Sequence, residues 1–284
     1  MVIQVLISGI LIGGIYALLA SGLSLTLGVM RVINLSHGVF YTLGSFILYS
    51  LFMQGRLNIF LSFLITALIV FIVGFIIEKT LLERVRELEM NVMILTFALA
   101  IFGEELIRLG WGVMYRSSHP FIKGSLQIGD LFFDYQRVLS FVVGMGMLST
   151  LIVVIKKTKL GKAARMVQQD HDMAMLLGIN VKFISAFVFG LGAMLSAAAA
   201  CLLAPLYLIF PAMGWTPLLI SFAIVILGGM GSITGTVIAG LLFGVVTLLT
   251  SYYISSGMVN VVPFLVIIIV LVFRPSGIMG KDIF

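Results

Sequence analysis

Long apolar stretches recur along the whole chain and constrain its fold more than any motif does. A membrane-crossing helix needs roughly 20 mainly apolar residues, and nine stretches approach or exceed that length. Because lipid offers no hydrogen bonds to the backbone, such stretches cross a membrane as helices. The sequence therefore predicts an all-α, polytopic transmembrane helical bundle of about 8–9 spans, some short or broken, in a single domain over residues 1–284. The nine stretches are residues 3–28, 37–54, 57–79, 90–112, 138–156, 183–204, 216–229, 233–252 and 258–273.

Composition agrees with an integral membrane protein. Only 10% of the residues are charged and 61% are hydrophobic, whereas soluble domains carry about 25% charged residues. The net charge of +6 comes from basic residues in loops between the apolar stretches. The positive-inside rule accounts for such loops, so the charge does not indicate nucleic acid. With three His and one Cys, the sequence has no Cys/His cluster of metal-binding spacing.

The basic residues also predict an orientation. They concentrate in residues 80–90, in residues 156–182, and in a tail that contains Arg274 and Lys281. If the chain crosses the membrane nine times from an outer N-terminus, all three regions and Arg31 fall on the cytoplasmic side.

Residues 28–46, here called the first break, read GVMRVINLSHGVFYTLGSF and interrupt the apolar pattern with polar residues and glycines. Polar residues at membrane depth line a cavity or find partners, and small residues let a helix break or a backbone approach closely. An ordinary cytoplasmic turn is the alternative. Neutral donors and acceptors suit a zwitterion or an amide, because they avoid the cost of burying a charge. The candidate pathway residues here are Asn34, Ser36, His37, Gly38 and Tyr41, although His37 can equally be a packing residue.

Residues 228–244, the second break, read GGMGSITGTVIAGLLFG and have a similar character. Two interrupted segments in different halves of a chain are typical of a transport site. Amides exposed at the start of a helix favour a carboxylate; a tight turn with close packing is the alternative. The candidate pathway residues here are Gly228, Gly229, Gly231 and Ser232.

Small residues also recur four apart in two of the apolar stretches, which predicts close helix contact. They are Gly9, Gly13 and Ala17 in the first stretch, and Gly231, Gly235, Ala239, Gly240 and Gly244 around the eighth.

Residues 156–183 are too polar to cross a membrane and are patterned as two short amphipathic helices. Asp170 is placed to cap the second helix, and Gly178 to end it in a left-handed conformation. An apolar stripe on such a helix requires either the groove of a soluble partner or an anionic lipid surface. The spacing alone does not distinguish these partners.

The segment Asp172-Met173-Ala174-x-x-x-Gly178 resembles the Glu-Ala-Ala-x-x-x-Gly loop of ABC importer permeases, with Asp in place of Glu and Met in place of Ala. More specifically, GKAARMVQQDHDMAMLLGINV resembles the corresponding loop of the branched-chain amino-acid permease family. Residues 17–44 and LGGMGSITGTVIAGLLFG resemble two further signatures of that family. The sequence contains no Gly-x-x-x-x-Gly-Lys-Ser/Thr phosphate loop.

The resemblance implies a transport subunit that is not an enzyme, in an ATP-driven importer of branched-chain or related small neutral amino acids. Importers of urea and short amides share the same signatures. It further implies a cytoplasmic (inner) membrane location in a bacterium or archaeon, a second related permease subunit, two ATP-binding subunits and an extracytoplasmic solute-binding protein. The chain itself would hold no cofactor, since ATP and Mg would bind the ATPases. The coupling loop would be about residues 157–181, with Gly161, Arg165, Asp172, Ala174, Gly178 and Asn180 as candidate coupling residues.

Two other classes of protein are disfavoured by the sequence. An ion-coupled transporter or channel needs a carboxylate or His relay at mid-span, but Glu104 and Glu105 lie near the end of a stretch, where Glu104 is placed to pair with Arg108. An intramembrane hydrolase using Ser36 and His37 is disfavoured because adjacent helical residues diverge by about 100 degrees.

Overall fold

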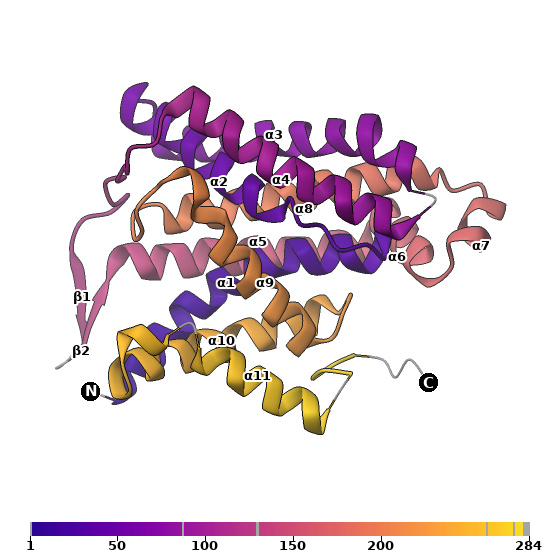
Figure 1. The fold of residues 1–284 in the computed structure, drawn as a ribbon. Helices are drawn as coiled ribbons and strands as arrows, with labels where there is room; N and C mark the ends of the chain where they lie inside the picture. Colours follow the sequence, from indigo (N-terminus) through magenta and orange to yellow (C-terminus); the bar gives the residue numbers. More distant parts are fainter. Residues whose placement is uncertain (1, 87, 129–130, 260, 275, 281–284) are drawn as a thin grey trace.

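The computed structural model describes residues 2–280 apart from 87, 129–130, 260 and 275, so Lys281 lies outside the described residues. Its helices form an elongated bundle (Figure 1). They are α1 (Val2–Met30), α2 (His37–Leu48), α3 (Ile59–Ile77), α4 (Glu89–Trp111), α5 (Tyr135–Lys157), α6 (Lys159–Gln169), α7 (His171–Leu176), α8 (Val181–Leu203), α9 (Trp215–Gly228), α10 (Ile233–Tyr253) and α11 (Val262–Phe273). The antiparallel hairpin of β1 (Ser125–Ile128) and β2 (Leu131–Asp134) precedes α5.

The prediction of an all-α membrane bundle is confirmed, and each of the nine apolar stretches contains a helix. Six helices of the described part are long and apolar enough to cross a membrane. They are α1, α3 with its extension to Val85, α5, α8, the segment Pro211–Gly228 and α10. The short or broken helices are also present: α2 has 12 residues before it continues as a π-helix at Tyr49–Gln54, and α11 has 12.

Helix α1 lies at the centre of the bundle, with 19 of its 29 residues buried. It runs antiparallel to α10, and small residues line the contact. A Cβ atom added to Gly13 would lie 2.8 Å from the carbonyl oxygen of Gly240, and one added to Gly9 would lie 2.7 Å from the Cα atom of Val245. The predicted close contact between these two glycine-rich helices is therefore confirmed, because no larger side chain fits between the backbones.

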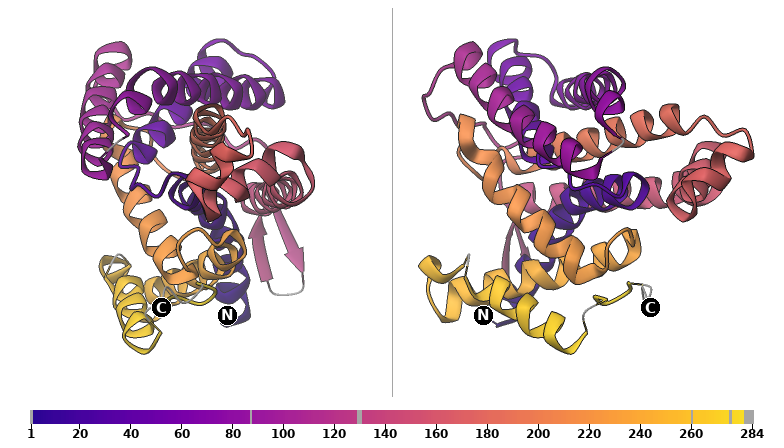
Figure 2. Two further views of the ribbon diagram at one scale, coloured as in Figure 1. Left: turned by 90° about the vertical axis from the view of Figure 1, so that its right-hand side faces the viewer. Right: turned by 45° about the vertical axis from the view of Figure 1, so that its right-hand side comes forward.

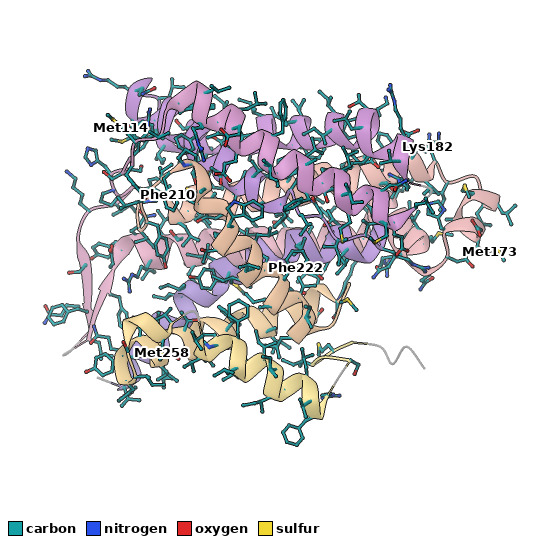
Figure 3. All side chains as sticks on the ribbon, in the orientation of Figure 1. Met114, Met173, Lys182, Phe210, Phe222 and Met258 are labelled. Carbon is teal, nitrogen blue, oxygen red and sulfur yellow. The ribbon has the colours of Figure 1, made fainter. Side chains whose placement is uncertain are left out.

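The two ends of the bundle differ in what they carry. One end holds α6 and α7, the start of α4 and the residues just after α1, and the other holds the N-terminus and the hairpin β1–β2 (Figures 1 and 2). Met173 and Lys182 lie at the first end and Met114 at the second (Figure 3). We call these the α6–α7 end and the hairpin end. The basic segment 156–182 thus shares one end with Arg31 and with the link between α3 and α4, as the charge distribution predicts.

Candidate functional site

The first break carries the chain back into the bundle. Helix α1 ends at Met30, Arg31 takes a left-handed conformation with φ of 56°, and residues 31–36 are not helical. Helix α2 then begins at His37, whose Nε2 atom lies 3.0 Å from the carbonyl oxygen of Leu19. Because a carbonyl can only accept, Nε2 carries the proton in this contact. Leu19 precedes the end of α1 by 11 residues, or about 16 Å at 1.5 Å per residue. Helix α2 therefore starts deep inside the bundle.

Side chains satisfy the irregular backbone of the first break. The Asn34 Oδ1 atom accepts hydrogen bonds from the backbone N–H (3.0 Å) and the hydroxyl (2.6 Å) of Ser36. The Thr96 hydroxyl of α4 accepts from the N–H of Leu35 at 3.3 Å, and the Ser196 hydroxyl of α8 donates to the carbonyl of His37 at 2.9 Å. Non-helical backbone at membrane depth requires such partners, so these polar residues hold the break in place.

The predicted pathway residues of the first break are all buried, and the side chain of Asn34 is 4% exposed. His37 lies between α1 and α8, and Tyr41 belongs to the main hydrophobic core. Gly38 packs against the turn before α9, because a Cβ atom on Gly38 would lie 2.5 Å from the carbonyl oxygen of Gly214. In this conformation none of these side chains is open to solvent. Their role as solute contacts stays a prediction.

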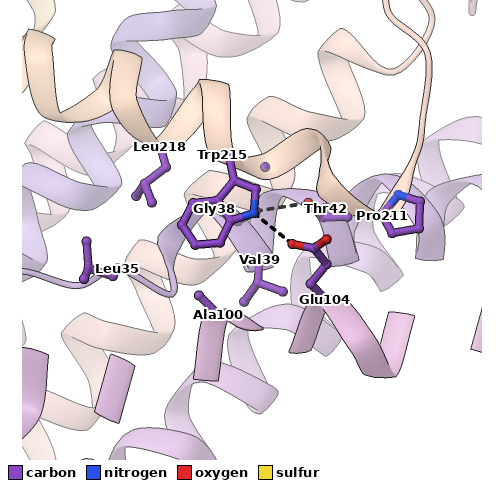
Figure 4. Close-up of a pocket in the computed structure, with 10 residues that line it drawn as sticks. Leu35, Gly38, Val39, Thr42, Ala100, Glu104, Pro211, Trp215 and Leu218 are labelled. Carbon is purple, nitrogen blue, oxygen red and sulfur yellow. Dashed lines mark hydrogen bonds between the residues drawn. The ribbon is translucent and has the colours of Figure 1, made fainter. Parts of the chain in front are cut away.

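A small pocket lies beside the start of α2 (Figure 4). Its volume of about 10 Å³ is enough for one water molecule and not for an amino acid. Glu104 of α4 accepts a hydrogen bond from the indole N–H of Trp215 at 2.8 Å and pairs with Arg108 at 2.9 Å. The predicted pair of Glu104 with Arg108 is confirmed, and both carboxylate oxygens of Glu104 are engaged. The pocket is lined by Leu35, Gly38, Val39, Thr42, Ala100, Glu104, Pro211, Gly214, Trp215 and Leu218.

The second break is built from backbone conformations that favour glycine. Gly229 and Gly231 have φ of 97° and 77°, in the left-handed region. The Ser232 hydroxyl caps α10 by accepting from the N–H of Gly235 at 3.2 Å. On the other side, the chain after α11 pairs with the end of α9, since the N–H of Ile278 donates to the carbonyl of Leu227 at 2.8 Å. The turn is thus tightly packed, as one of the two interpretations of its sequence expects.

The structure brings the ends of the two breaks together but separates their candidate residues. A Cβ atom on Gly28 would lie 2.9 Å from the Cα atom of Gly231. However, Gly38 packs near the first residue of α9, whereas Gly228 is its last. Fourteen helical residues separate these points by about 21 Å. The nine candidate pathway residues therefore form two groups at opposite ends of α9 rather than one pocket.

Helices α6 and α7 confirm the predicted local structure of the polar segment. The Asp170 carboxylate caps α7 by accepting from the N–H groups of Asp172 (3.0 Å) and Met173 (2.9 Å). Gly178 ends the helix with φ of 78°. Gly161 fixes α6 against the end of α5, because a Cβ atom there would lie 2.5 Å from the Cα atom of Ile155.

The six candidate coupling residues divide by exposure. Arg165, Asp172, Gly178 and Asn180 are exposed. Gly161 and Ala174 are buried, and the side chain of Asn180 caps α8 at the N–H of Phe183. The apolar stripe expected from the sequence includes Leu176 and Leu177, which are 81% and 64% exposed. Met173 and Met175 were not assigned to that stripe, yet they are also 57% and 51% exposed. Among the described residues, no group of three His, Cys, Asp or Glu side chains is placed to hold a metal ion.

Comparison with known proteins places the chain in one family. The family model described as "Branched-chain amino acid transport system / permease component" matches residues 5–271. The chain is 31% identical to the high-affinity branched-chain amino acid transport system permease protein BraD of Pseudomonas aeruginosa, over 98% of this chain and 96% of the relative. It is 30% identical to the protein LivH of Escherichia coli K12 over the same shares, and 29% identical to a probable LivH of the archaeon Methanocaldococcus jannaschii, over 98% and 93%.

No solved structure matches the chain. The family model covers nearly all of the sequence. The chain is an integral membrane protein and belongs to the branched-chain amino acid transport system permease family.

Proposed function

We propose that this chain is the membrane-spanning subunit of an ATP-driven importer for branched-chain or related small neutral amino acids, in a cytoplasmic membrane. It would act with a second related permease subunit, two ATP-binding subunits and an extracytoplasmic solute-binding protein. ATP and Mg would bind the ATP-binding subunits, and no cofactor is expected in this chain. The names of the relatives support this substrate class.

The exposed apolar surface of α7 carries the proposal. Leu176 is 81% exposed and Leu177 is 64% exposed, whereas Ala174, two and three residues earlier, is 1% exposed. Large apolar side chains grouped on one short helix mark a surface that another molecule covers. Helix α7 stands at the outermost point of the α6–α7 end (Figure 1). A soluble ATPase with an apolar groove could bind α7 at this position. Helix α6, which connects α7 to the bundle, would then transmit the movement of the ATPase.

The closed pathway fits one state of an alternating-access cycle. In this conformation His37 and Tyr41 are buried and the pocket beside Gly38 is too small for an amino acid. Transport then requires a second state in which the helices around the first break separate. A coupling helix can favour that state only if its contacts differ between the two states.

The neutral polar residues at the start of α2 support a zwitterionic or amide solute. Asn34, Ser36 and His37 supply hydrogen-bonding groups without a permanent charge. A hydrophobic amino acid and urea are both compatible with such groups, so the substrate needs a direct test.

The test is uptake into proteoliposomes that contain the complete complex with its binding protein. We expect accumulation of radiolabelled leucine, isoleucine or valine that requires enclosed ATP and persists when ion gradients are collapsed. Faster uptake of urea than of any of the three amino acids would overturn the substrate class. Uptake that needs an ion gradient and no ATP would overturn the mechanism.

A second test addresses the partner of α7. The substitution Leu176→Glu places a charge on the exposed apolar surface, so we expect loss of the ATP-binding subunits during purification of the complex. Leu109→Glu is the matched control, because Leu109 is 83% exposed and lies near the end of α4 at the hairpin end. If both variants retain the ATP-binding subunits equally, α7 is not their docking surface.

A further inference from the structure

The last turn of α6 contacts both breaks. Arg31 follows α1 in the first break, and its Nη2 atom donates to the carbonyl oxygens of Gln168 (3.2 Å) and Gln169 (3.1 Å). Those carbonyls belong to the C-terminal turn of α6, where the helix leaves carbonyl groups without partners and carries partial negative charge. A guanidinium with its fixed fork of donors suits this position.

The side chain of Gln168 reaches the second break from the same turn. Its Nε2 atom donates to the carbonyl oxygen of Gly231 at 3.2 Å. Gly28 completes the site, because a Cβ atom on Gly28 would lie 2.9 Å from the Cα atom of Gly231 and 3.0 Å from the Gln168 Nε2 atom. We call Gly28, Arg31, Gln168 and Gly231 the α6 junction.

The elements on either side of the α6 junction are rigid enough to transmit a displacement. Gly161 fixes the start of α6 to the end of α5, and the apolar side chains of Ala164 and Val167 are buried against the core. On the other side, α1 and α10 pack backbone to backbone along their glycines. A shift at the end of α6 therefore acts on both helices, because packed elements move as units rather than deforming continuously.

We propose that Arg31 and Gln168 are positioning residues that transmit the movement of α6 and α7 to both breaks. This inference rests on the proposed function, since it assumes that a partner ATPase moves α6 and α7. In it, Arg31 holds the chain that leads into α2, and Gln168 holds the turn between α9 and α10. The two contacts let one helix end act on both sides of the predicted solute pathway.

The experiment measures how many solute molecules are imported for each ATP hydrolysed, in proteoliposomes with the complete complex. The solute is whichever of leucine, isoleucine and valine the wild-type complex imports fastest. Arg31→Ala removes both hydrogen bonds to α6, and Gln168→Met removes the donor while keeping the length of the side chain. We expect the ratio of uptake to hydrolysis to fall about tenfold in each variant. Stimulated ATP hydrolysis stays within about twofold of wild type.

Matched controls exist at the hairpin end. Arg56 is also exposed and has a left-handed φ of 51°, and Gln54 is an exposed glutamine nearby. Arg56→Ala and Gln54→Met are expected to keep the wild-type ratio. The double variant of Arg31 and Gln168 is expected to be no worse than about the poorer single variant, since residues that act as one unit are not additive.

The outcomes separate the two proposals. If wild type shows no ATP-dependent uptake, the proposed function fails. If wild type transports but uptake and hydrolysis fall together in both junction variants, or neither falls, the α6 junction does not couple them and the inference is wrong. If Arg31→Ala reduces the amount of complex in the membrane, Arg31→Met replaces it, since this variant keeps an extended side chain without a donor. A retained wild-type ratio in both Arg31→Met and Gln168→Met, at normal expression, overturns the inference.

Discussion

The two breaks look alike in sequence and are stabilised in different ways. In the first, side chains satisfy an irregular backbone deep in the bundle: Asn34 bonds to Ser36, and Thr96 to Leu35. In the second, left-handed glycines make a tight turn, whose neighbour Leu227 receives a backbone hydrogen bond from Ile278. Side-chain hydrogen bonds therefore stabilise the first break, whereas the second break depends on glycines, because a residue without a side chain can adopt its left-handed, tightly packed turn.

This difference predicts opposite sensitivities. Removing a side chain should harm the first break, because buried polar backbone loses its partner. Adding one should harm the second, because a left-handed, close-packed backbone has no room for a Cβ atom. Each effect is measurable as the free energy of unfolding in mixed detergent micelles, with the fluorescence of Trp111 and Trp215 as the signal.

The largest effect is expected from Gly229→Ala in the second break. The φ of 97° is unfavourable for alanine, and the new Cβ atom would lie 2.6 Å from the Cα atom of Gly280. Together the strain and the overlap should cost about 3 kcal/mol. Gly146→Ala on α5 is the control, because a Cβ atom added there would have no atom within 4 Å beyond the adjacent backbone of its own helix. If the two variants have the same free energy of unfolding, steric overlap and backbone strain do not restrict substitution in the second break.

An intermediate loss of stability is expected from Asn34→Ala in the first break. The substitution leaves the N–H and hydroxyl of Ser36, both buried, without their acceptor. We expect a loss of about 2 kcal/mol. Ser149→Ala removes a hydroxyl that is exposed and bonds only to its own helix at Met145, so it should cost under about 0.5 kcal/mol. Equal effects would show that the Asn34 contacts do not hold the break.

The smallest effect is expected from Thr96→Val, which keeps the shape of the side chain. It removes the acceptor for the Leu35 N–H at 3.3 Å and a long hydrogen bond to the Ile33 carbonyl at 3.4 Å, and should cost about 1 kcal/mol. Thr80→Val is matched, because Thr80 is exposed and bonds to Ile76 of its own helix. A change for Thr96→Val no greater than for Thr80→Val would contradict the role of α4 in supporting the break.

Much of the fold follows from local sequence, because apolar length, glycine spacing and helix caps act over a few residues. The nine apolar stretches, the glycine contact of α1 with α10 and the Asp170 cap are all of this kind. The depth at which α2 begins does not follow from local sequence. It depends on the contacts of His37 with Leu19 and of Ser196 with His37, which join residues 18 and 159 positions apart.

The candidate site was harder to predict for the same reason. Sequence identified both breaks but could not place their candidate pathway residues in two groups at opposite ends of α9, since that depends on the packing of Gly38 against Gly214. Gln168 gave no signal, because a glutamine in a polar helix is ordinary and its partner Gly231 is 63 residues away. Glu104 was paired correctly with Arg108 on its own helix, whereas its bond to Trp215 spans 111 residues.

The most direct test of the account measures two distances between spin labels in the assembled transporter, with and without ATP. The first distance is between labels at Lys162 of α6 and Met230 of the second break, and the second is between labels at Met230 and at Met114 of the hairpin end; all three residues are exposed. The account predicts that the first distance stays constant while the second changes, because α6 and the second break move together. A first distance that changes while the second stays constant would contradict it.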